Sequence, residues 1–218
     1  DTVLVEENGA RFEVPLAGGQ KTGWFYDHRM NRQRLQAYAP GKKVLDVFSY
    51  VVGGGIQAAC AGASQVTCVD ASSSAVDAVH HNAKLNGLDN VDTIEGDAFD
   101  ALKALADEKE KFDIVVLDPP ALIPRRRDQK AGEQAYARLN QLGLRLLERD
   151  GLLVSASCSM HLSQEKLIDI IRGSGRKIDR FVQLLEQGHQ APDHPIVPGI
   201  PETDYIKSCF VRSLTGFF

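Results

Sequence analysis

Short apolar segments of strand length alternate with segments of helical periodicity along most of this 218-residue chain. The expected strands are 43–48, 66–70, 91–94, 114–118, 152–156, 178–185 and 205–212. Helices are expected between them, over 28–38, 56–61, 72–86, 97–105 and 134–147, and from 163 onward. Such alternation is typical of a parallel sheet with helices on both faces. We therefore predict an α/β fold built on a doubly wound, mostly parallel sheet.

Local signals add detail to this prediction. Asn8-Gly9 separates two alternating segments at the start of the chain, and this dipeptide is a strong signal for a tight hairpin turn. We expect a β-hairpin there. Asp27 is placed to cap the first helix, and Asn82, in the third helix, is expected at the surface. The 114–118 segment is the most apolar strand and is expected at a buried, central position.

Charge limits the kind of partner. The net charge is −4, from 25 basic and 29 acidic residues, whereas proteins that hold nucleic acid by bulk electrostatics need clustered Lys and Arg. The exception is one local cluster, in which Arg125, Arg126, Arg127 and Lys130 surround Asp128. No apolar run reaches the roughly 20 residues that cross a bilayer. We expect a cytoplasmic protein without membrane contact, with either a small ligand or a local basic surface.

The four cysteines are far apart and form neither a Cys-x-x-Cys pair nor a cluster with histidine, so we predict no disulfide framework and no metal site. Cys60, Cys68 and Cys209 are interpreted as buried packing residues. Cys158 differs, because it follows the fifth strand directly in Ser157-Cys158-Ser159. A partly exposed thiolate there is suited to attack on an electron-poor ring carbon. The six histidines show no ligand spacing and are interpreted as surface or structural residues.

Four acids end consecutive strands: Asp46, Asp70, Asp97 and Asp118. A single such acid is usually a helix cap or a turn residue, but four in a row favour ligand binding at the carboxyl edge of the sheet. Asp70 is placed to bind the ribose hydroxyls of a nucleotide-like cofactor. The carboxylate of Asp97 is placed to accept from an adenine amino group, with Phe99 flanking the ring.

Two classes of cofactor could bind at this edge of the sheet, a dinucleotide or S-adenosylmethionine. Gly53 to Ala58 fits the dinucleotide pattern G-x-G-x-x-A, but residues 48–52 separate the strand from the first glycine. An S-adenosylmethionine site needs no pyrophosphate-binding turn and typically has an acid such as Asp46 before the glycine loop. We favour S-adenosylmethionine. In Asp118-Pro119-Pro120, two prolines fix the backbone where it leaves the sheet. They hold the acid at the switch point, the place where the order of the strands in the sheet reverses.

Several blocks resemble the RlmI-like ribosomal RNA (cytosine carbon-5) methyltransferases along nearly the whole chain. They are 19–29 (GQKTGWFYDHR), 44–50 (VLDVFSY), 118–121 (DPPA), 157–159 (SCS), 194–195 (HP) and 201–207 (PETDYIK). The resemblance implies a class I methyltransferase fold, S-adenosylmethionine as cofactor, and ribosomal RNA, most plausibly of the large subunit, as substrate. It also implies that residues 1–20 are the last hairpin of a linking domain, that 21–218 form the methyltransferase domain, and that an RNA-binding domain precedes this chain.

The resemblance assigns roles to individual residues. Cofactor binding is expected from Asp46, Phe48, Ser49, Tyr50, Gly53, Asp70, Ala71, Asp97, Ala98 and Asp118. Cys158 is the expected nucleophile, with Asp118 holding the ring-nitrogen edge of the base. Arg125, Arg126 and Arg127 lie in the basic loop after Asp118, where they either contact neighbouring phosphates or form a solvated charged loop. Lys21 and Arg29 are assigned either to RNA or to the cofactor carboxylate, and oligomeric state, monomer or homodimer, is left open.

Two segments depart from the family pattern: Val51, Val52 and Gly54 stand in the glycine loop, and Leu122 replaces a common aromatic residue. Three rival functions follow. A same-fold enzyme that methylates an exocyclic nitrogen would use Asp118 and leave Cys158 dispensable. A nicotinamide-dependent oxidoreductase would bind NAD. A non-catalytic RNA-binding relic would bind no cofactor.

Overall fold

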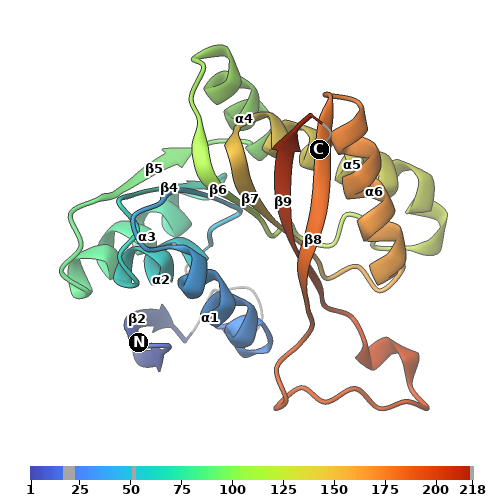
Figure 1. The fold of residues 1–218 in the computed structure, drawn as a ribbon. Helices are drawn as coiled ribbons and strands as arrows, with labels where there is room; N and C mark the ends of the chain where they lie inside the picture. The colour runs from blue at the N-terminus through green and yellow to red at the C-terminus, as the bar shows by residue number, and fades with distance from the viewer. Residues whose placement is uncertain (17–22, 51–52, 217–218) are drawn as a thin grey trace.

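The computed structural model describes residues 1–16, 23–50 and 53–216 (Figure 1). Its strands are β1 (Thr2–Glu7), β2 (Ala10–Pro15), β3 (Lys43–Val47), β4 (Gln65–Asp70), β5 (Val91–Glu95), β6 (Phe112–Leu117), β7 (Leu147–Ser157), β8 (Arg180–Gly188) and β9 (Lys207–Thr215). Its helices are α1 (Arg29–Tyr38), α2 (Gly54–Cys60), α3 (Ser73–Leu85), α4 (Ala98–Asp107), α5 (Gln129–Arg145) and α6 (Gln164–Arg176), with the short turns η1 (Tyr26–His28), η2 (Arg126–Asp128) and η3 (Pro201–Thr203). The order of these elements confirms the predicted alternation.

Seven strands form one sheet in the order β5-β4-β3-β6-β7-β9-β8. The pairs among β5, β4, β3, β6 and β7 are parallel, while β9 runs antiparallel to both β7 and β8. The predicted doubly wound, mostly parallel sheet is therefore confirmed. Chain order reverses between β3 and β6, and ligands of such sheets bind beyond the carboxyl ends of the strands at that switch point. Asp46 and Asp118 stand at this point.

Two apolar cores cover the two faces of the sheet. On one face, Leu35 of α1, Ile56 of α2 and Val79 of α3 pack against the sheet. On the other face, helices α4, α5 and α6 contribute Leu102, Leu139 and Leu167, among others. The helices therefore cover both faces, as Figure 1 also shows. Every residue from Ile114 to Leu117 of β6 is buried, which confirms the predicted central position of this strand.

The predicted hairpin is present as β1 and β2, which pair antiparallel with Glu7 opposite Ala10. Asn8 and Gly9 form the turn with φ values of 51° and 82°, as a tight hairpin turn requires. The hairpin packs on α3, where Asn82 accepts a hydrogen bond of 2.8 Å from the backbone amide of Glu13. Asn82 is fully buried, so its expected surface position is wrong. The boundary drawn between residues 20 and 21 lies outside the described residues.

Two further predictions of detail are wrong. Asp27 does not cap α1, because it lies within η1 and its carboxylate accepts a hydrogen bond from the Tyr205 hydroxyl at 2.8 Å. Cys60 ends a helix on the surface and is exposed, whereas Cys68 and Cys209 are buried as expected. Helix α5 begins at Gln129, five residues before the expected start, because the polar residues that follow Asp128 are helical as well. No helix in the described part of the chain is long and apolar enough to cross a membrane.

Candidate active site

The turn after β3 forms one wall of the site. Phe48 and Tyr50 both have positive φ values, 64° and 44°, which non-glycine residues seldom adopt and which are common at functional sites. The backbone amide of Ser49 donates to the carbonyl oxygen of Val69 at 3.1 Å, so the turn is held against the neighbouring strand. This conformation places residues 48–50 beside the carboxyl end of β4. Val51 and Val52 lie outside the described residues.

Asp46 is the buried acid of this wall. Its carboxylate accepts a hydrogen bond of 2.8 Å from the Gly55 amide at the start of α2. Burial, with smaller contributions from the charges of Asp118 and Asp70, raises the pKa of Asp46 to about 7. A Cβ atom at Gly53 would lie 3.2 Å from the Asp46 carboxylate, so glycine lets the backbone approach this acid closely. Asp46 therefore ties the end of β3 to the start of α2.

Asp70 links the turns after β3 and β4. One carboxylate oxygen accepts from the Tyr50 amide and the other from the Ser72 amide, each at 2.9 Å. Each oxygen keeps a second lone pair, and the residue is partly exposed. Asp97 caps α4 by accepting from the Asp100 amide at 3.1 Å, and it is exposed at the end of the adjacent strand. Both acids can therefore accept further hydrogen bonds at the carboxyl edge of the sheet.

Asp118 and Cys158 come together on the other side of the switch point. The Cys158 thiol lies 3.9 Å from the carbonyl oxygen of Pro119, and Cys158 is partly buried. The side chain of Asp118 is 41% exposed, and its Oδ1 lies 3.6 Å from Nε2 of His28. The structure thus brings the two predicted catalytic residues into one place, with a thiol and an accessible carboxylate on adjacent loops.

A buried hydroxyl network holds these loops. The Tyr136 hydroxyl, on α5, accepts from Ser157 at 2.9 Å and shares a hydrogen bond of 2.7 Å with Ser159. The Ser159 hydroxyl in turn accepts from the amide of Ile123 at 3.3 Å. Both serines that flank Cys158 are fully buried. Ile123 lies in the loop that carries Asp118. The network therefore ties this loop to residues 157–159, which carry the thiol and are called the thiol loop below.

The segment between β8 and β9 closes a third side. The amide of Ala191 donates to the carbonyl oxygen of Asp27 at 2.9 Å, and the Tyr205 hydroxyl donates to the Asp27 carboxylate. Arg29 forms an ion pair of 2.5 Å with Asp193. The structure therefore gives Arg29 a partner within the protein, and Arg29 holds this segment near the site.

Apart from Arg29, the described residues that were predicted to bind RNA take no part in these contacts. Arg125, Arg126 and Arg127 are exposed at η2, in the loop that follows Asp118. Arg125 pairs with Asp128 at 2.8 Å. Arg126 and Arg127 form no ion pair with any residue that the structure describes. Lys21 lies outside the described residues.

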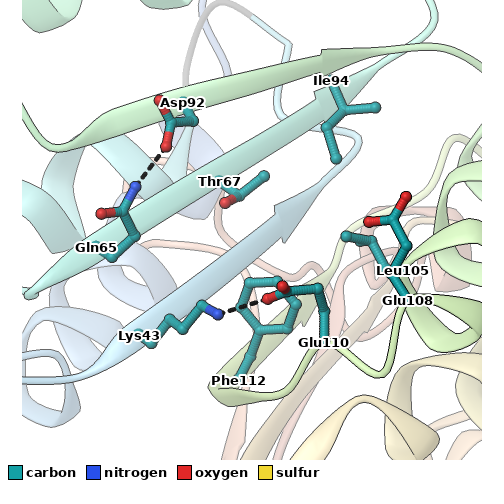
Figure 2. A pocket seen from close by; sticks show the side chains of 9 residues that line it. All are labelled: Lys43, Gln65, Thr67, Asp92, Ile94, Leu105, Glu108, Glu110 and Phe112. Atoms are coloured by element: carbon teal, nitrogen blue, oxygen red, sulfur yellow. Dashed lines mark hydrogen bonds and ion pairs between the residues drawn. The ribbon is translucent and has the colours of Figure 1, made fainter.

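A separate hollow of about 530 Å³ lies at the opposite edge of the sheet (Figure 2). It is lined by the first residues of β3 and β4, where Lys43 forms an ion pair of 2.7 Å with Glu110 and Gln65 bonds Asp92 at 2.5 Å. Because these are the amino ends of the strands, the hollow is far from the switch point. We do not assign it to the active site.

Comparison with known proteins decides the family. The family described as S-adenosylmethionine-dependent methyltransferase matches residues 1–201. This chain belongs to that family. Methyltransferases of this kind that resemble it include "Ribosomal RNA large subunit methyltransferase I" of Aeromonas salmonicida, 39% identical over 98% of this chain and 54% of the relative. The "Ribosomal RNA large subunit methyltransferase" of Deinococcus radiodurans is 37% identical over 97% of this chain and 52% of the relative.

A solved structure agrees with these relatives. The methyltransferase SMU.776, crystallised in complex with SAH, superimposes with a TM-score of 0.86 at 26% identity and covers 97% of this chain and 56% of that one. The predicted resemblance to RlmI-like methyltransferases and the predicted class I fold are both confirmed. The chain spans about half the length of the curated relatives that it matches.

The residues of this methyltransferase fit S-adenosylmethionine. Ribose hydroxyls, an adenine amino group and the methionyl ammonium are all donors, and the carboxyl edge of β3 to β5 offers carboxylates that accept. The buried hydroxyl of Ser49 has no hydrogen-bond partner among the described residues, so a donor or acceptor of the cofactor would satisfy it. Within the described residues there is no cluster of His, Cys, Asp or Glu that could hold a metal ion.

Sequence reasoning missed three residues of the site. His28 faces Asp118, Tyr136 bonds both serines beside Cys158, and the ammonium of Lys207 bonds the carbonyl oxygen of Ser159 at 2.6 Å. The sequence places Tyr136 at an ordinary apolar position of a helix. Lys207 could have been found from the sequence, because an ionisable residue at the start of a buried strand is unusual.

Proposed function

We propose that this chain is the catalytic part of an enzyme that forms 5-methylcytidine in large-subunit ribosomal RNA. The observation that carries the proposal is the meeting of Cys158 with the Asp118 loop, where the thiol lies 3.9 Å from the Pro119 carbonyl oxygen. A nucleophilic thiol is useful for methylation at a ring carbon, whereas methylation of an exocyclic nitrogen does not need one. The names of the curated relatives support large-subunit ribosomal RNA as the substrate.

The cofactor is proposed to lie along the carboxyl ends of β3 to β6. The residues assigned to it are Asp46, Phe48, Ser49, Tyr50, Gly53, Asp70, Ala71, Asp97, Ala98 and Asp118. Asp70 is expected to accept from the ribose hydroxyls and Asp97 from the adenine amino group, because each carboxylate has free lone pairs at this edge. When bound, S-adenosylmethionine supplies an electrophilic methyl group.

Cys158 is proposed to act first. Its thiolate adds to carbon-6 of the cytosine, so that a sulfur–carbon bond forms and the electron pair of the 5,6 double bond moves to carbon-5. Carbon-5, which is otherwise a weak nucleophile, then becomes able to accept a methyl group. Loss of the carbon-5 proton to a base restores the double bond and releases the thiolate, so atoms and charges balance over the cycle.

Asp118 is proposed to bind the ring-nitrogen edge of the same base. Its side chain is accessible and stands on the loop that contacts the thiol, so a base attacked by Cys158 would lie within its reach. Hydrogen bonding or protonation at the ring nitrogen stabilises the charge that develops on the adduct. His28, 3.6 Å from Asp118, is placed to orient this carboxylate.

The RNA strand is proposed to cross the mouth of the site over η2. The target base must leave its stack or lie in a single-stranded region to reach Cys158. Arg126 and Arg127 are exposed next to the Asp118 loop, so their guanidinium groups can contact the phosphates that flank this base. Arg125, which pairs with Asp128, is expected to contribute less.

The test uses the full chain, unmodified ribosomal RNA and S-adenosylmethionine, followed by digestion and mass spectrometry of the nucleosides. We expect 5-methylcytidine with the wild type and none with Cys158→Ala, while Cys60→Ala, at an exposed and distant cysteine, keeps the product. A base methylated on an exocyclic nitrogen, or 5-methylcytidine that persists in Cys158→Ala, would contradict the covalent route. Absence of any methylated nucleoside together with absence of SAH binding would favour an RNA-binding relic.

A further inference from the structure

Lys207 carries a buried positive charge beside the thiol loop. It begins β9 and pairs with Ser157 across the β7–β9 ladder, and it is only 5% exposed. Its ammonium donates to the carbonyl oxygens of Ser159 at 2.6 Å and Tyr205 at 3.2 Å. Among the described residues it forms no ion pair with a carboxylate. A buried ammonium is costly unless an anion or several acceptors compensate it, so an anion near this group is expected.

We propose that Lys207 is a positioning residue that stabilises the thiolate form of Cys158 and fixes the loop that carries it. The inference rests on the proposed function, in which this thiolate attacks the base. The ammonium bonds the carbonyl oxygen of Ser159, the residue next to Cys158, so its charge lies on the segment that carries the thiol. Thiolates are characteristically stabilised by a neighbouring cation or by hydrogen-bond donors. When the Cys158 thiol loses its proton, the Lys207 ammonium therefore provides a counter-charge for the thiolate.

The electrostatics of the groups around this pair agree with the proposal. Burial lowers the pKa of the Lys207 ammonium, and the negative charges of Asp204 and of the Cys158 thiolate raise it in opposition. Burial is the largest cause of the raised pKa values of the Tyr136 and Tyr205 phenols, and the charge of Cys158 raises both further. The other charged or titratable groups at this mouth are Asp27, His28, Arg29, Asp118 and Asp193. Lys207 is the one cation of this set that bonds the thiol loop directly.

Alkylation rates measure the thiolate without any need for RNA or cofactor. The full chain is treated with iodoacetamide across a range of pH, and modification of each cysteine is quantified by peptide mass spectrometry. Cys60 is exposed, and burial raises the pKa of its thiol, so it provides an internal reference without a cation. Cys68 and Cys209 are buried and stay unmodified while the protein is folded.

We expect the midpoint pH for Cys158 alkylation in the wild type to lie below the ordinary thiol value of about 8.5. In Lys207→Met, the midpoint for Cys158 should rise by about one pH unit, which slows its alkylation near neutral pH about tenfold, while that of Cys60 stays unchanged. Lys207→Arg keeps the charge and should retain most of the low midpoint. Protection of Cys68 and Cys209 shows in the same sample that each variant is folded.

Two results would overturn the inference. One is a wild-type midpoint for Cys158 that is no lower than the ordinary thiol value of about 8.5, which decides the matter even if Lys207→Met does not fold. The other is an unchanged midpoint for Cys158 in folded Lys207→Met. Failure of the proposed function gives a different result, because 5-methylcytidine would then persist in Cys158→Ala whatever the alkylation midpoints are.

Discussion

The two sides of the switch point hold their functional groups by different means. On the side of β3, β4 and β5, carboxylates accept from backbone amides, most of which are close in sequence: Asp46 from Gly55, Asp70 from Ser72, and Asp97 from Asp100. Asp70 also accepts from the Tyr50 amide, 20 residues away. On the side of β6, β7 and β9, side chains from distant segments meet. Ser159 is bonded by Tyr136 and Lys207, which are 23 and 48 residues away.

This difference separates two tasks. A cofactor site at the edge of a parallel sheet is built largely from turns, so short-range hydrogen bonds are sufficient to shape it. A nucleophile must also be held at a fixed distance from the base and kept ionised, and this requires buried groups from several elements. Substitutions on the cofactor side, at β3 to β5, should therefore alter folding stability and cofactor binding. Substitutions on the catalytic side, at β6, β7 and β9, should alter turnover while cofactor affinity is preserved.

The largest expected effect concerns the buried acid on the cofactor side. The pKa of Asp46 is raised from 3.8 to about 7 in the folded protein, so the folded state holds a proton that the unfolded state releases between these values. Stability contributed by this group is present below pH 4 and is lost as pH rises through 7. Asp46→Asn should therefore gain stability relative to the wild type over this window, by up to about 4 kcal/mol.

Urea unfolding of both proteins at several pH values checks this expectation. The difference in the free energy of unfolding should be smallest near pH 4 and largest above pH 7. If the difference in the free energy of unfolding does not vary with pH, Asp46 is ionised in the folded protein over this whole range. The cofactor side would then hold a buried charge rather than a neutral acid.

A smaller effect is expected on the catalytic side from Tyr136→Phe. The phenylalanine fills the same space but leaves the hydroxyls of Ser157 and Ser159 without their shared partner, which costs about 1–3 kcal/mol of folding stability. Turnover of RNA should fall as the thiol loop loosens, while SAH affinity, measured by calorimetry, should stay unchanged. Loss of SAH affinity in this variant would break the separation between the two sides.

Tyr38→Phe is a matched control for this change. Tyr38 lies on α1, where burial and the charge of Glu186 raise the pKa of its phenol, and it belongs to a different element from the groups that hold the thiol loop. Removal of this hydroxyl should leave both turnover and SAH affinity unchanged. A similar fall in turnover in both variants would point to a general loss of stability as the cause.

The smallest effect is expected at the rim of the catalytic side. The double variant Arg126→Ala with Arg127→Ala should weaken RNA binding a few-fold and reduce the slope of log affinity against log salt by about one to two. Arg125→Ala should change the slope less, because its guanidinium is already paired with Asp128. Filter binding at several salt concentrations measures both. Equal slopes for all three proteins would remove η2 from the RNA path.

The sequence predicts the sheet, its helices and the acids of the cofactor side because each follows from local pattern. Asp46, Asp70 and Asp97 end strands, and that position alone determines their place at the carboxyl edge. The caps of α3, α4 and α6 are likewise the residues Ser72, Asp97 and Ser163 at the predicted helix starts. For Cys158 and Asp118, the family resemblance assigned both to one base, and the parallel pairing of β6 with β7 in the structure brings their loops together.

The groups that support Cys158 could not be predicted from the local sequence pattern, because they depend on contacts between distant segments. Tyr136 occupies a helical position that periodicity assigns to the core, and nothing in its neighbourhood indicates where its hydroxyl points. Lys207 reaches the thiol loop because β9 inserts antiparallel beside β7, a pairing between segments about 50 residues apart. Asp27 was misassigned for the same reason, since its partner Tyr205 is 178 residues away.

The most direct test of the account is to trap the proposed adduct. Ribosomal RNA that contains 5-fluorocytidine lacks the carbon-5 proton whose loss releases the enzyme, so a covalent complex should accumulate with the full chain and S-adenosylmethionine. We predict a complex that survives denaturing electrophoresis, carries the nucleotide on Cys158 by mass spectrometry, and is absent with Cys158→Ala. A wild-type protein that forms no such complex while methylating normal RNA, or a complex that persists in Cys158→Ala, would contradict Cys158 as the nucleophile.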